Sequence, residues 1–452
     1  MNQKHRRTAA VAGGLTLALA LAGCAPGTGQ TAGPAEPAGD ISTDISQFGD
    51  VTLTVWDQEV RGGQNEQIEE LNAAFEEKYP NVTIERNSQA FDDLATTLRL
   101  ALTDDNAPDV VQANNGRNTM GAFVEAGQLR PLDDYAEAYG WFDRYQESIL
   151  QYSTYSEDAK VFGEGNLYGL PQVGEVVGIF YSKAKLEKLG VEVPGTWTEF
   201  DAALATAKAA GETPMQLGNI EQWPAGHVFG PLQGEYVDAE SITNLGLGNP
   251  GASWTTPENV EAATELKSWV DDGYFNSGVN GTDYDAAWQA LASGNGVFLI
   301  GGSWLAADLE ASMGDDLGFF VPKTSDGALA TTGGTGLPFA MTSAADNTDV
   351  AAAYIDFLTS DEAMQILADT GNLPVNNSAE LAPESGVFAD IYGAFGEVTE
   401  SGSVLPYLDY ATPTFGDTLG QSLQGLIDGQ LTPEQFTEAL ETDYAAFTAA
   451  NE

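Results

Sequence analysis

The chain has 452 residues, of which 42% are hydrophobic and 10% aromatic, so we expect two globular domains or one large split unit. Lys and Arg number 17 against 67 Asp and Glu, which gives a formal net charge of −50. Such a surface repels nucleic acid and anionic lipid, and it disfavours an anionic ligand, whose pocket would need Arg or Lys. Because the sequence holds 1 Cys, no intrachain disulfide can form.

The first 23 residues have the pattern of a secretory signal peptide. Three basic residues precede an apolar run over residues 9–22, which is too short to be a membrane span. The sequence LAG then leads directly into Cys24, and this resembles a bacterial lipobox. The resemblance implies that Cys24 is acylated and holds the mature protein at the extracytoplasmic face of the cell membrane. The alternative is a spare cysteine beside an ordinary signal.

Residues 24–50 are rich in Gly, Pro, Ala and Thr and predict a flexible tether, so order is expected from Val51 onwards. Apolar patterning then predicts alternating strands and helices over residues 51–56, 64–79, 82–85, 91–104 and 109–112. This alternation is typical of a parallel α/β sheet.

The second half of the chain continues the mixture of strands and helices. Strands are predicted at 176–181 and 297–300. The sequence TWTE starting at Thr196 resembles a helix capping box, with Glu199 within reach. Helices are predicted at residues 183–190, 199–210, 286–294 and 351–369, and from Pro433 onwards.

The residue inventory argues against several enzyme classes. The sequence has 2 His, and one of them lies in the signal, so only His227 remains and HExxH or clustered His/Cys metal sites cannot form. No GxSxG elbow or phosphate-binding glycine loop is present. A glycoside hydrolase needs only two carboxylates, and this class stays open. We therefore expect no catalytic residue, no cofactor and no metal.

An ordered series of short motifs carries a family resemblance. It consists of YGLP at 168–171, Glu175, IFYSK at 179–183, the TWTEF stretch at 196–200 and GNLPV at 371–375. The series resembles the family 1 extracellular solute-binding proteins of bacterial ABC sugar importers, in the branch that carries maltose and other oligosaccharides.

The resemblance implies an α/β, two-lobed periplasmic-binding-protein-like fold, with a hinge of crossing segments and a ligand cleft between the lobes. Lobe 1 is expected over 51–173 and 336–374, and lobe 2 over 174–335 and 375–452. The crossings are expected near residues 171–177, 332–339 and 373–377.

The implied function is a monomeric substrate-binding lipoprotein. It would capture a neutral sugar or oligosaccharide and deliver it to an ABC permease, without binding nucleic acid. Open alternatives are a non-sugar solute such as an amino acid, polyamine or phosphodiester, a surface adhesin or sensor, and the two-carboxylate glycoside hydrolase.

Sugar sites combine aromatic faces with Asp, Glu, Asn and Gln side chains that bond hydroxyl groups. Two strand ends supply such polar groups: Gln58 and Glu59 follow the first strand, and Asn114 and Asn115 follow the strand at 109–112. Each pair could instead form a plain polar turn.

The family resemblance adds candidates in lobe 2 and at the crossings. It implies that Glu175 bonds sugar hydroxyls and that Trp304 stacks on a sugar ring; a hinge ion pair and a core tryptophan are the respective alternatives. The remaining candidates are Trp223, Gly334, Thr335, Asn372, Tyr407 and Asp409.

Overall fold

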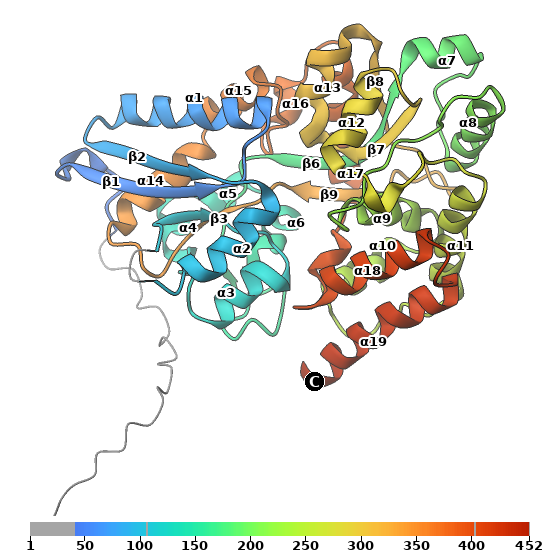
Figure 1. Cartoon of the computed structure of the whole chain (residues 1–452). Helices are drawn as coiled ribbons and strands as arrows, with labels where there is room; N and C mark the ends of the chain where they lie inside the picture. Colours follow the sequence, from blue (N-terminus) through green and yellow to red (C-terminus); the bar gives the residue numbers. More distant parts are fainter. Residues whose placement is uncertain (1–40, 105–106, 402–403, 452) are drawn as a thin grey trace, which may run out of the picture.

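The computed structural model describes residues 41–104, 107–401 and 404–451, which form two bodies side by side (Figure 1). The first sheet has the order β10-β3-β1-β2. Strands β1 (Val51–Asp57), β2 (Val82–Ser88) and β3 (Val110–Gln112) are parallel, and β10 (Phe339–Met341) pairs antiparallel with β3. We call the body around this sheet lobe 1, and its strand–helix alternation is confirmed.

The second sheet is mostly antiparallel, and we call the body around it lobe 2. Its centre is β6 (Gly174–Ser182), a nearly continuous buried strand. Strands β7 (Phe298–Gly302), β8 (Leu317–Phe320) and β9 (Thr331–Thr335) all pair antiparallel with β6. Strand β11 (Val404–Leu405) adds to β9 in parallel. The apolar run of β6 fits this position because a strand covered on both faces needs apolar side chains throughout.

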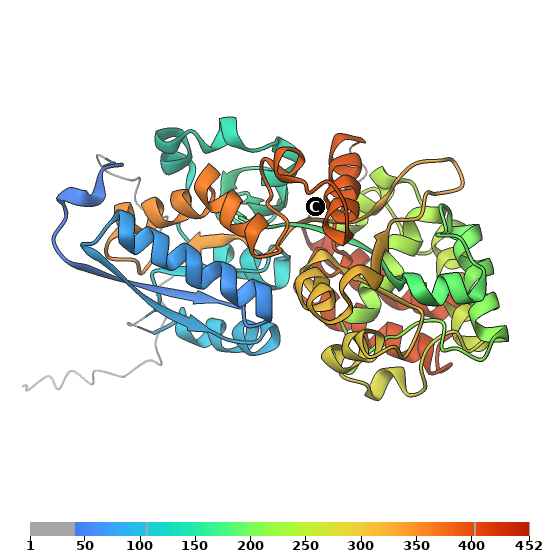
Figure 2. The same cartoon turned by 90° about the horizontal axis from the view of Figure 1, so that it is seen from above.

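Segments that connect the lobes lie beside one another. The backbone N–H of Gly174 donates to the carbonyl oxygen of Leu373 at 2.8 Å, and that of Gly336 donates to the carbonyl oxygen of Val173 at 3.0 Å. Figures 1 and 2 show β6 running between the two bodies. The two-lobed fold with a hinge of crossing segments is therefore confirmed, while the lobe boundaries by residue number stay predictions.

Helices surround both sheets. Lobe 1 carries α1 (Gly62–Lys78), α2 (Phe91–Ala101), α3 (Ala122–Glu125), α4 (Asp133–Tyr139), α5 (Trp141–Arg144), α6 (Glu147–Leu150), α14 (Thr348–Leu358) and α15 (Asp361–Asp369), with the small hairpin β4 (Thr154–Tyr155) and β5 (Asn166–Leu167). Lobe 2 carries α7 (Lys183–Leu189), α8 (Trp197–Ala209), α9 (Pro224–Tyr236), α10 (Ala239–Gly246), α11 (Pro257–Asp271), α12 (Tyr284–Ala292), α13 (Ala306–Met313), α16 (Ser378–Leu381), α17 (Val387–Ser401), α18 (Phe415–Ile427) and α19 (Pro433–Asn451).

The folded body starts before Val51, within the stretch assigned to the tether. A short 3-10 helix, Ile45–Gln47, places Ile45 in the core of lobe 1, where its side chain is fully buried. Asn81 donates from its side-chain amide to the carbonyl oxygen of Ile45 at 3.1 Å, which ties this turn to the start of β2. Cys24 and the signal lie outside the described residues.

The single helix predicted at 351–369 is wrong, because two helices occupy this stretch. Helix α14 ends at Leu358 and α15 begins at Asp361. Ser360 adopts an extended conformation between them, and its hydroxyl accepts a hydrogen bond from the backbone N–H of Ala363. Apolar periodicity continues through the break, so the apolar pattern alone does not reveal the helix cap at Ser360.

Candidate functional site

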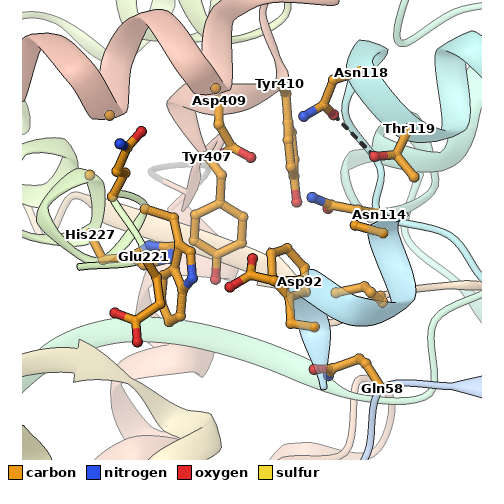
Figure 3. A pocket seen from close by; sticks show the side chains of 18 of the residues that line it. Gln58, Asp92, Asn114, Asn118, Thr119, Glu221, His227, Tyr407, Asp409 and Tyr410 are labelled. Carbon is orange, nitrogen blue, oxygen red and sulfur yellow. Dashed lines mark hydrogen bonds between the residues drawn. The ribbon is translucent and has the colours of Figure 1, made fainter. Parts of the chain in front are cut away.

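A cleft of about 420 Å³ lies between the lobes, within the range of roughly 300–1,000 Å³ typical of small-molecule sites. Residues that follow β1 and β3 line it from lobe 1, together with α2. Residues around the start of α9, the end of β7 and the stretch 407–420 line it from lobe 2. Figure 3 shows Asn114 and Asn118 on one side, Glu221 and His227 on the other, and Tyr407 and Tyr410 between them.

The tip after β1 is fixed from behind by a buried ion pair. Arg86 donates to the two carboxylate oxygens of Asp57 at 2.6 and 2.8 Å and to the carbonyl oxygen of Glu59 at 2.7 Å. Gln112 accepts from the backbone N–H of Gln58 at 2.9 Å and donates to the Glu59 carboxyl group at 2.8 Å. The ends of β1 and β3 are thus locked together, with Gln58 at the cleft surface.

The adjacent amides after β3 have different environments. Asn114 is partly exposed and lines the cleft. Asn115 is fully buried, and its Nδ2 donates to the carbonyl oxygen of Tyr152 at 2.6 Å. Its Oδ1 accepts from the hydroxyl of Tyr410 at 3.3 Å, a bond that joins the two lobes. Asn114 is therefore available to a ligand, whereas Asn115 anchors this segment to Tyr152 and Tyr410.

Glu175 lies at the base of the cleft, where β6 leaves the hinge. The hydroxyl of Tyr407 donates to one of its carboxyl oxygens at 2.8 Å. Burial raises the pKa of Glu175 to about 8, and the nearby Glu59 carboxylate adds to this shift against the effect of the Tyr407 bond. Near neutral pH the group carries a proton, so it can donate as well as accept a hydrogen bond.

Aromatic rings form the lobe 2 wall. The His227 ring lies 5.4 Å from Trp223, 5.2 Å from Trp304 and 5.0 Å from Tyr407, measured between ring centroids. Burial lowers the pKa of His227 to about 4, so the imidazole is neutral. Trp304 donates from Nε1 to the hydroxyl of Tyr284 at 2.8 Å. The wall is therefore an aromatic surface in which the imidazole of His227 is neutral and the indole N–H of Trp304 is bonded to Tyr284.

A glycine is needed for the placement of Trp304. A Cβ atom built at Gly302 would overlap the indole ring, so the ring lies directly over the bare backbone of this residue. Any larger residue at 302 would push the indole ring away from its position beside the cleft. The turn that ends β7 thus has glycine for a packing reason.

The cleft brings together most of the residues predicted to bind ligand: Gln58, Asn114, Glu175, Trp223, Trp304, Thr335, Tyr407 and Asp409. Direct contact with a ligand stays a prediction for each of them. Burial raises the pKa of Asp409 to about 6, so this carboxyl group also holds its proton more tightly than usual.

Other predicted residues do not line the cleft, and internal contacts account for their positions. Glu59 is buried behind Gln58. Asn372 donates from Nδ2 to the carbonyl oxygen of Gly63 at 2.9 Å and ties the crossing turn to the start of α1. Gly334 pairs with Glu175 between β9 and β6 and has a φ of 115°, where the Tyr152 ring occupies the space of a side chain.

Residues 62–365 match the family model of the bacterial extracellular solute-binding proteins, which covers more than half of the chain. The chain belongs to this family. It is 25% identical over 309 residues to a multiple sugar-binding protein of Streptococcus mutans, covering 67% of this chain and 70% of that one. It is 23% identical over 346 residues to a maltodextrin-binding protein of Bacillus subtilis, covering 74% and 75%.

Solved structures of similar fold agree with the two-lobed architecture. A chitin oligosaccharide-binding protein superposes with a TM-score of 0.75 at 25% identity, covering 88% of this chain and 99% of its own. The GacH receptor of Streptomyces glaucescens superposes with a TM-score of 0.71 at 22% identity, covering 88% and 98%, and shows the fold alone.

In this solute-binding protein, several cleft residues escaped sequence analysis. Asp92, Thr96 and Arg99 project from one face of α2, opposite the buried Leu94 and Leu98. Their spacing could have been read from the amphipathic pattern, but polar residues on an exposed face carry no signal for a ligand. Glu221 lies in a turn, Asn118 in a short π-helix (Arg117–Gly121) and Tyr410 in a 3-10 helix (Leu408–Tyr410), and segments this short give no periodic pattern.

Two further properties concern the described part of the chain. Across residues 41–104, 107–401 and 404–451, no three His, Cys, Asp or Glu side chains are grouped so that they could hold a metal ion. Among the helices of these same ranges, none combines the length and apolar character needed to cross a bilayer.

Proposed function

We propose that this protein captures a neutral oligosaccharide in the cleft and presents it to an ABC permease. The observation that carries the proposal is the composition of the cleft walls: partly exposed Trp223 and Trp304 face amide and hydroxyl groups of the other lobe. Aromatic faces can stack on sugar rings while amides bond vicinal hydroxyls. Relatives named for binding several sugars, maltodextrin and chitin oligosaccharides support the ligand class.

The charges in the cleft support a neutral ligand. A raised pKa keeps the proton on Glu175 near neutral pH and the proton on Asp409 in mildly acidic conditions, and His227 is uncharged. Of the two arginines that line the cleft, Arg61 is engaged by Asp285 at 3.1 Å, and Arg99 donates to the carbonyl oxygen of Asn118 at 2.8 Å. Carboxyl groups of Asp92, Glu221 and Asp417 line the same cleft, so the site does not have the cluster of cations that a phosphate or carboxylate pocket usually needs.

The remaining parts of the proposal concern anchoring and activity. The mature chain is a monomer attached by lipid to Cys24 on the outer face of the membrane, and it binds its ligand without metal and without chemical conversion. A Cys24→Ser variant should be released into the medium or left with its signal uncleaved. A membrane-bound variant with a processed N-terminus would contradict the anchor.

A thermal-shift screen tests the ligand class. Maltotriose, chitotriose, xylotriose and neutral monosaccharides are compared with amino acids, polyamines and glycerophosphodiesters. A sugar at a hundredfold excess over its Kd should stabilise the protein by about 2.7 kcal/mol. Stabilisation by one of the other solutes alone would refute the sugar proposal, and turnover of an aryl glycoside or trisaccharide would refute the absence of catalysis.

A further inference from the structure

Arg117 is buried in an unusual environment for an arginine. Only 3% of its surface is exposed, and within the described residues its side chain contacts backbone carbonyl oxygens and aromatic rings, with no carboxylate among its hydrogen-bond partners. Burial lowers the pKa of the guanidinium group. Burying a cation in this way is costly, so its hydrogen bonds need an explanation.

The partners of Arg117 come from both lobes. The residue itself follows β3 in lobe 1, and its Nη1 donates to the carbonyl oxygens of Ala159 and Lys160 at 3.0 and 3.1 Å, in the loop of the β4–β5 hairpin. Its Nε donates to the carbonyl oxygen of Leu247 at 3.1 Å. Leu247 directly follows α10, which packs against β11 of lobe 2.

The C-terminal helix closes over the same side chain. The Phe447 ring of α19 lies 4.8 Å from the guanidinium carbon, and the Phe162 ring of lobe 1 lies 5.8 Å from it. Helix α19 packs on α11 and α18, and both views place its C-terminal end between the two bodies (Figures 1 and 2). The hydroxyl of Tyr444 donates to the carbonyl oxygen of Asn249, so α19 and the loop after α10 form one surface.

The fit at this junction is close. Gly248 has a φ of 67°, and a Cβ atom there would overlap the carbonyl oxygen of Ala411 and lie 3.1 Å from Nε of Arg117. Only glycine allows the loop to reach the guanidinium group in this conformation. The nearby bond from Tyr410 to Asn115 joins the lobes along the same edge.

We propose that Arg117 is a closure latch, a lobe 1 side chain that inserts into lobe 2 and stabilises the closed arrangement without touching the ligand. Arg117 does not line the cleft, so it acts on the balance between open and closed forms. Separating the lobes would remove the bond to Leu247 and the Phe447 face while leaving the bonds to lobe 1. Because the desolvation cost offsets much of the gain, the latch can open reversibly.

The proposal rests on the proposed function only for its ligand arm, and the ligand-free arm is independent. Small-angle scattering of the full mature chain is measured for wild type, Arg117→Ala and Arg117→Lys, each without sugar and with sugar. The sugar is whichever of maltotriose, chitotriose and xylotriose gives the largest thermal shift. Its concentration is about 10-fold above Kd, so that most of the sites are occupied. Arg117→Ala should show a larger radius of gyration in at least one condition and bind the trisaccharide at least about tenfold more weakly.

The Lys variant separates charge from geometry. A single ammonium group lacks the fixed fork with which a guanidinium group reaches carbonyl oxygens of both lobes. The radius of gyration and the Kd of Arg117→Lys should therefore lie between those of wild type and Arg117→Ala.

Arg144→Ala is the matched control. Arg144 also donates to backbone and side-chain oxygens, but its partners Asp356 and Thr359 belong to lobe 1, as it does. This variant should lower the melting temperature and leave the radius of gyration and the Kd at their wild-type values.

Three outcomes would contradict either the latch or the proposed function. Wild-type radii for Arg117→Ala in both conditions overturn the latch, as does an equal change in Arg144→Ala. If no trisaccharide binds wild type, the proposed function fails while the ligand-free scattering still tests the latch.

Discussion

The two walls of the cleft are built from different chemistry. Lobe 1 presents amides, hydroxyls and charged side chains at strand ends and along α2, among them Gln58, Asn114 and Thr96. Lobe 2 presents the rings of Trp223, Trp304 and other aromatic residues, with the carboxyl groups of Glu175, Glu221 and Asp409 beside them. The polar wall is fixed by hydrogen bonds within a parallel sheet edge, whereas the aromatic wall is fixed by ring packing above an antiparallel sheet.

This difference indicates that the two walls make different contributions to ligand binding. Stacking suits any sugar with an apolar face, so we expect the lobe 2 wall to supply affinity. Directional bonds to hydroxyls distinguish one sugar from another, so we expect the lobe 1 wall to supply specificity. Neither wall encloses a ligand alone, and a tight site needs both lobes together.

The strongest test of the comparison removes an aromatic face. Trp304→Ala should weaken sugar binding by about 1–3 kcal/mol, because a stacked ring contributes contact area that a methyl group cannot replace. Isothermal titration with the best trisaccharide from the screen measures the loss. A fluorescence change on binding that wild type shows should largely disappear in this variant.

A tryptophan of the lobe 1 core provides the matched control. Trp141 is fully buried, donates from Nε1 to Asp356 at 2.9 Å and is not among the residues that line the cleft. Trp141→Phe should lower the melting temperature and leave the Kd unchanged. If Trp304→Ala instead lowers the melting temperature and binds normally, Trp304 is a core residue and the aromatic wall loses its assigned role.

A smaller effect is expected at the polar wall, where adjacent asparagines make a natural pair. Asn114→Ala removes a partly exposed amide and should cost about 0.5–1.5 kcal/mol of binding energy for one sugar, with a different loss for a sugar epimeric at the bonded hydroxyl. Asn115→Ala leaves the carbonyl oxygen of Tyr152 without its donor, so it should chiefly lower the melting temperature. Equal losses for all epimers in Asn114→Ala would contradict a specificity role for this wall.

The sequence predicted the parts of the fold that periodicity governs. Strand β1 and helix α1 appear close to their predicted bounds because their apolar residues alternate or recur with clean spacing. The break at Ser360 was missed because a cap residue interrupts the backbone without interrupting the apolar pattern. The buried Ile45 was missed because one anchoring side chain in a Gly- and Pro-rich stretch gives no periodic signal.

For the site, the sequence located strand ends but not side-chain directions. Gln58 and Glu59 are neighbours, yet only Gln58 faces the cleft, and the deciding partner Gln112 is remote in sequence. Likewise, the carboxylate expected at Glu175 has one oxygen engaged by Tyr407, which comes from the other end of the chain. Such pairings depend on tertiary contacts, which a single sequence does not reveal.

The smallest expected effect concerns protonation at the base of the cleft, between the two walls. Burial raises the pKa of Glu175 from 4.5 to about 8 and that of Glu59 from 4.5 to about 7. The folded protein therefore binds more protons than the unfolded chain over this range, and its stability should fall as pH rises. Below pH 6.5 His227 opposes this trend, because burial lowers its pKa from 6.5 to about 4.

The informative window thus lies between pH 6.5 and 8, where the opposing contribution of His227 fades as its imidazole loses its proton in the unfolded chain as well. In Glu175→Gln the amide oxygen can still accept the hydrogen bond from Tyr407, and the amide nitrogen can donate as the protonated carboxyl group does. The free energy of sugar binding near pH 6.5 should therefore change by less than about 0.7 kcal/mol, or threefold in Kd. The fall in melting temperature across the window should be shallower than in wild type, with the remainder due to other carboxyl groups whose pKa is raised into this range, among them Glu59 and Asp201, each to about 7. Glu192→Gln, at an exposed position, should keep the wild-type slope. An unchanged slope in Glu175→Gln would mean that ionisation of this carboxyl group does not limit stability, and a large loss of affinity at low pH would mean that the ligand requires the charged form.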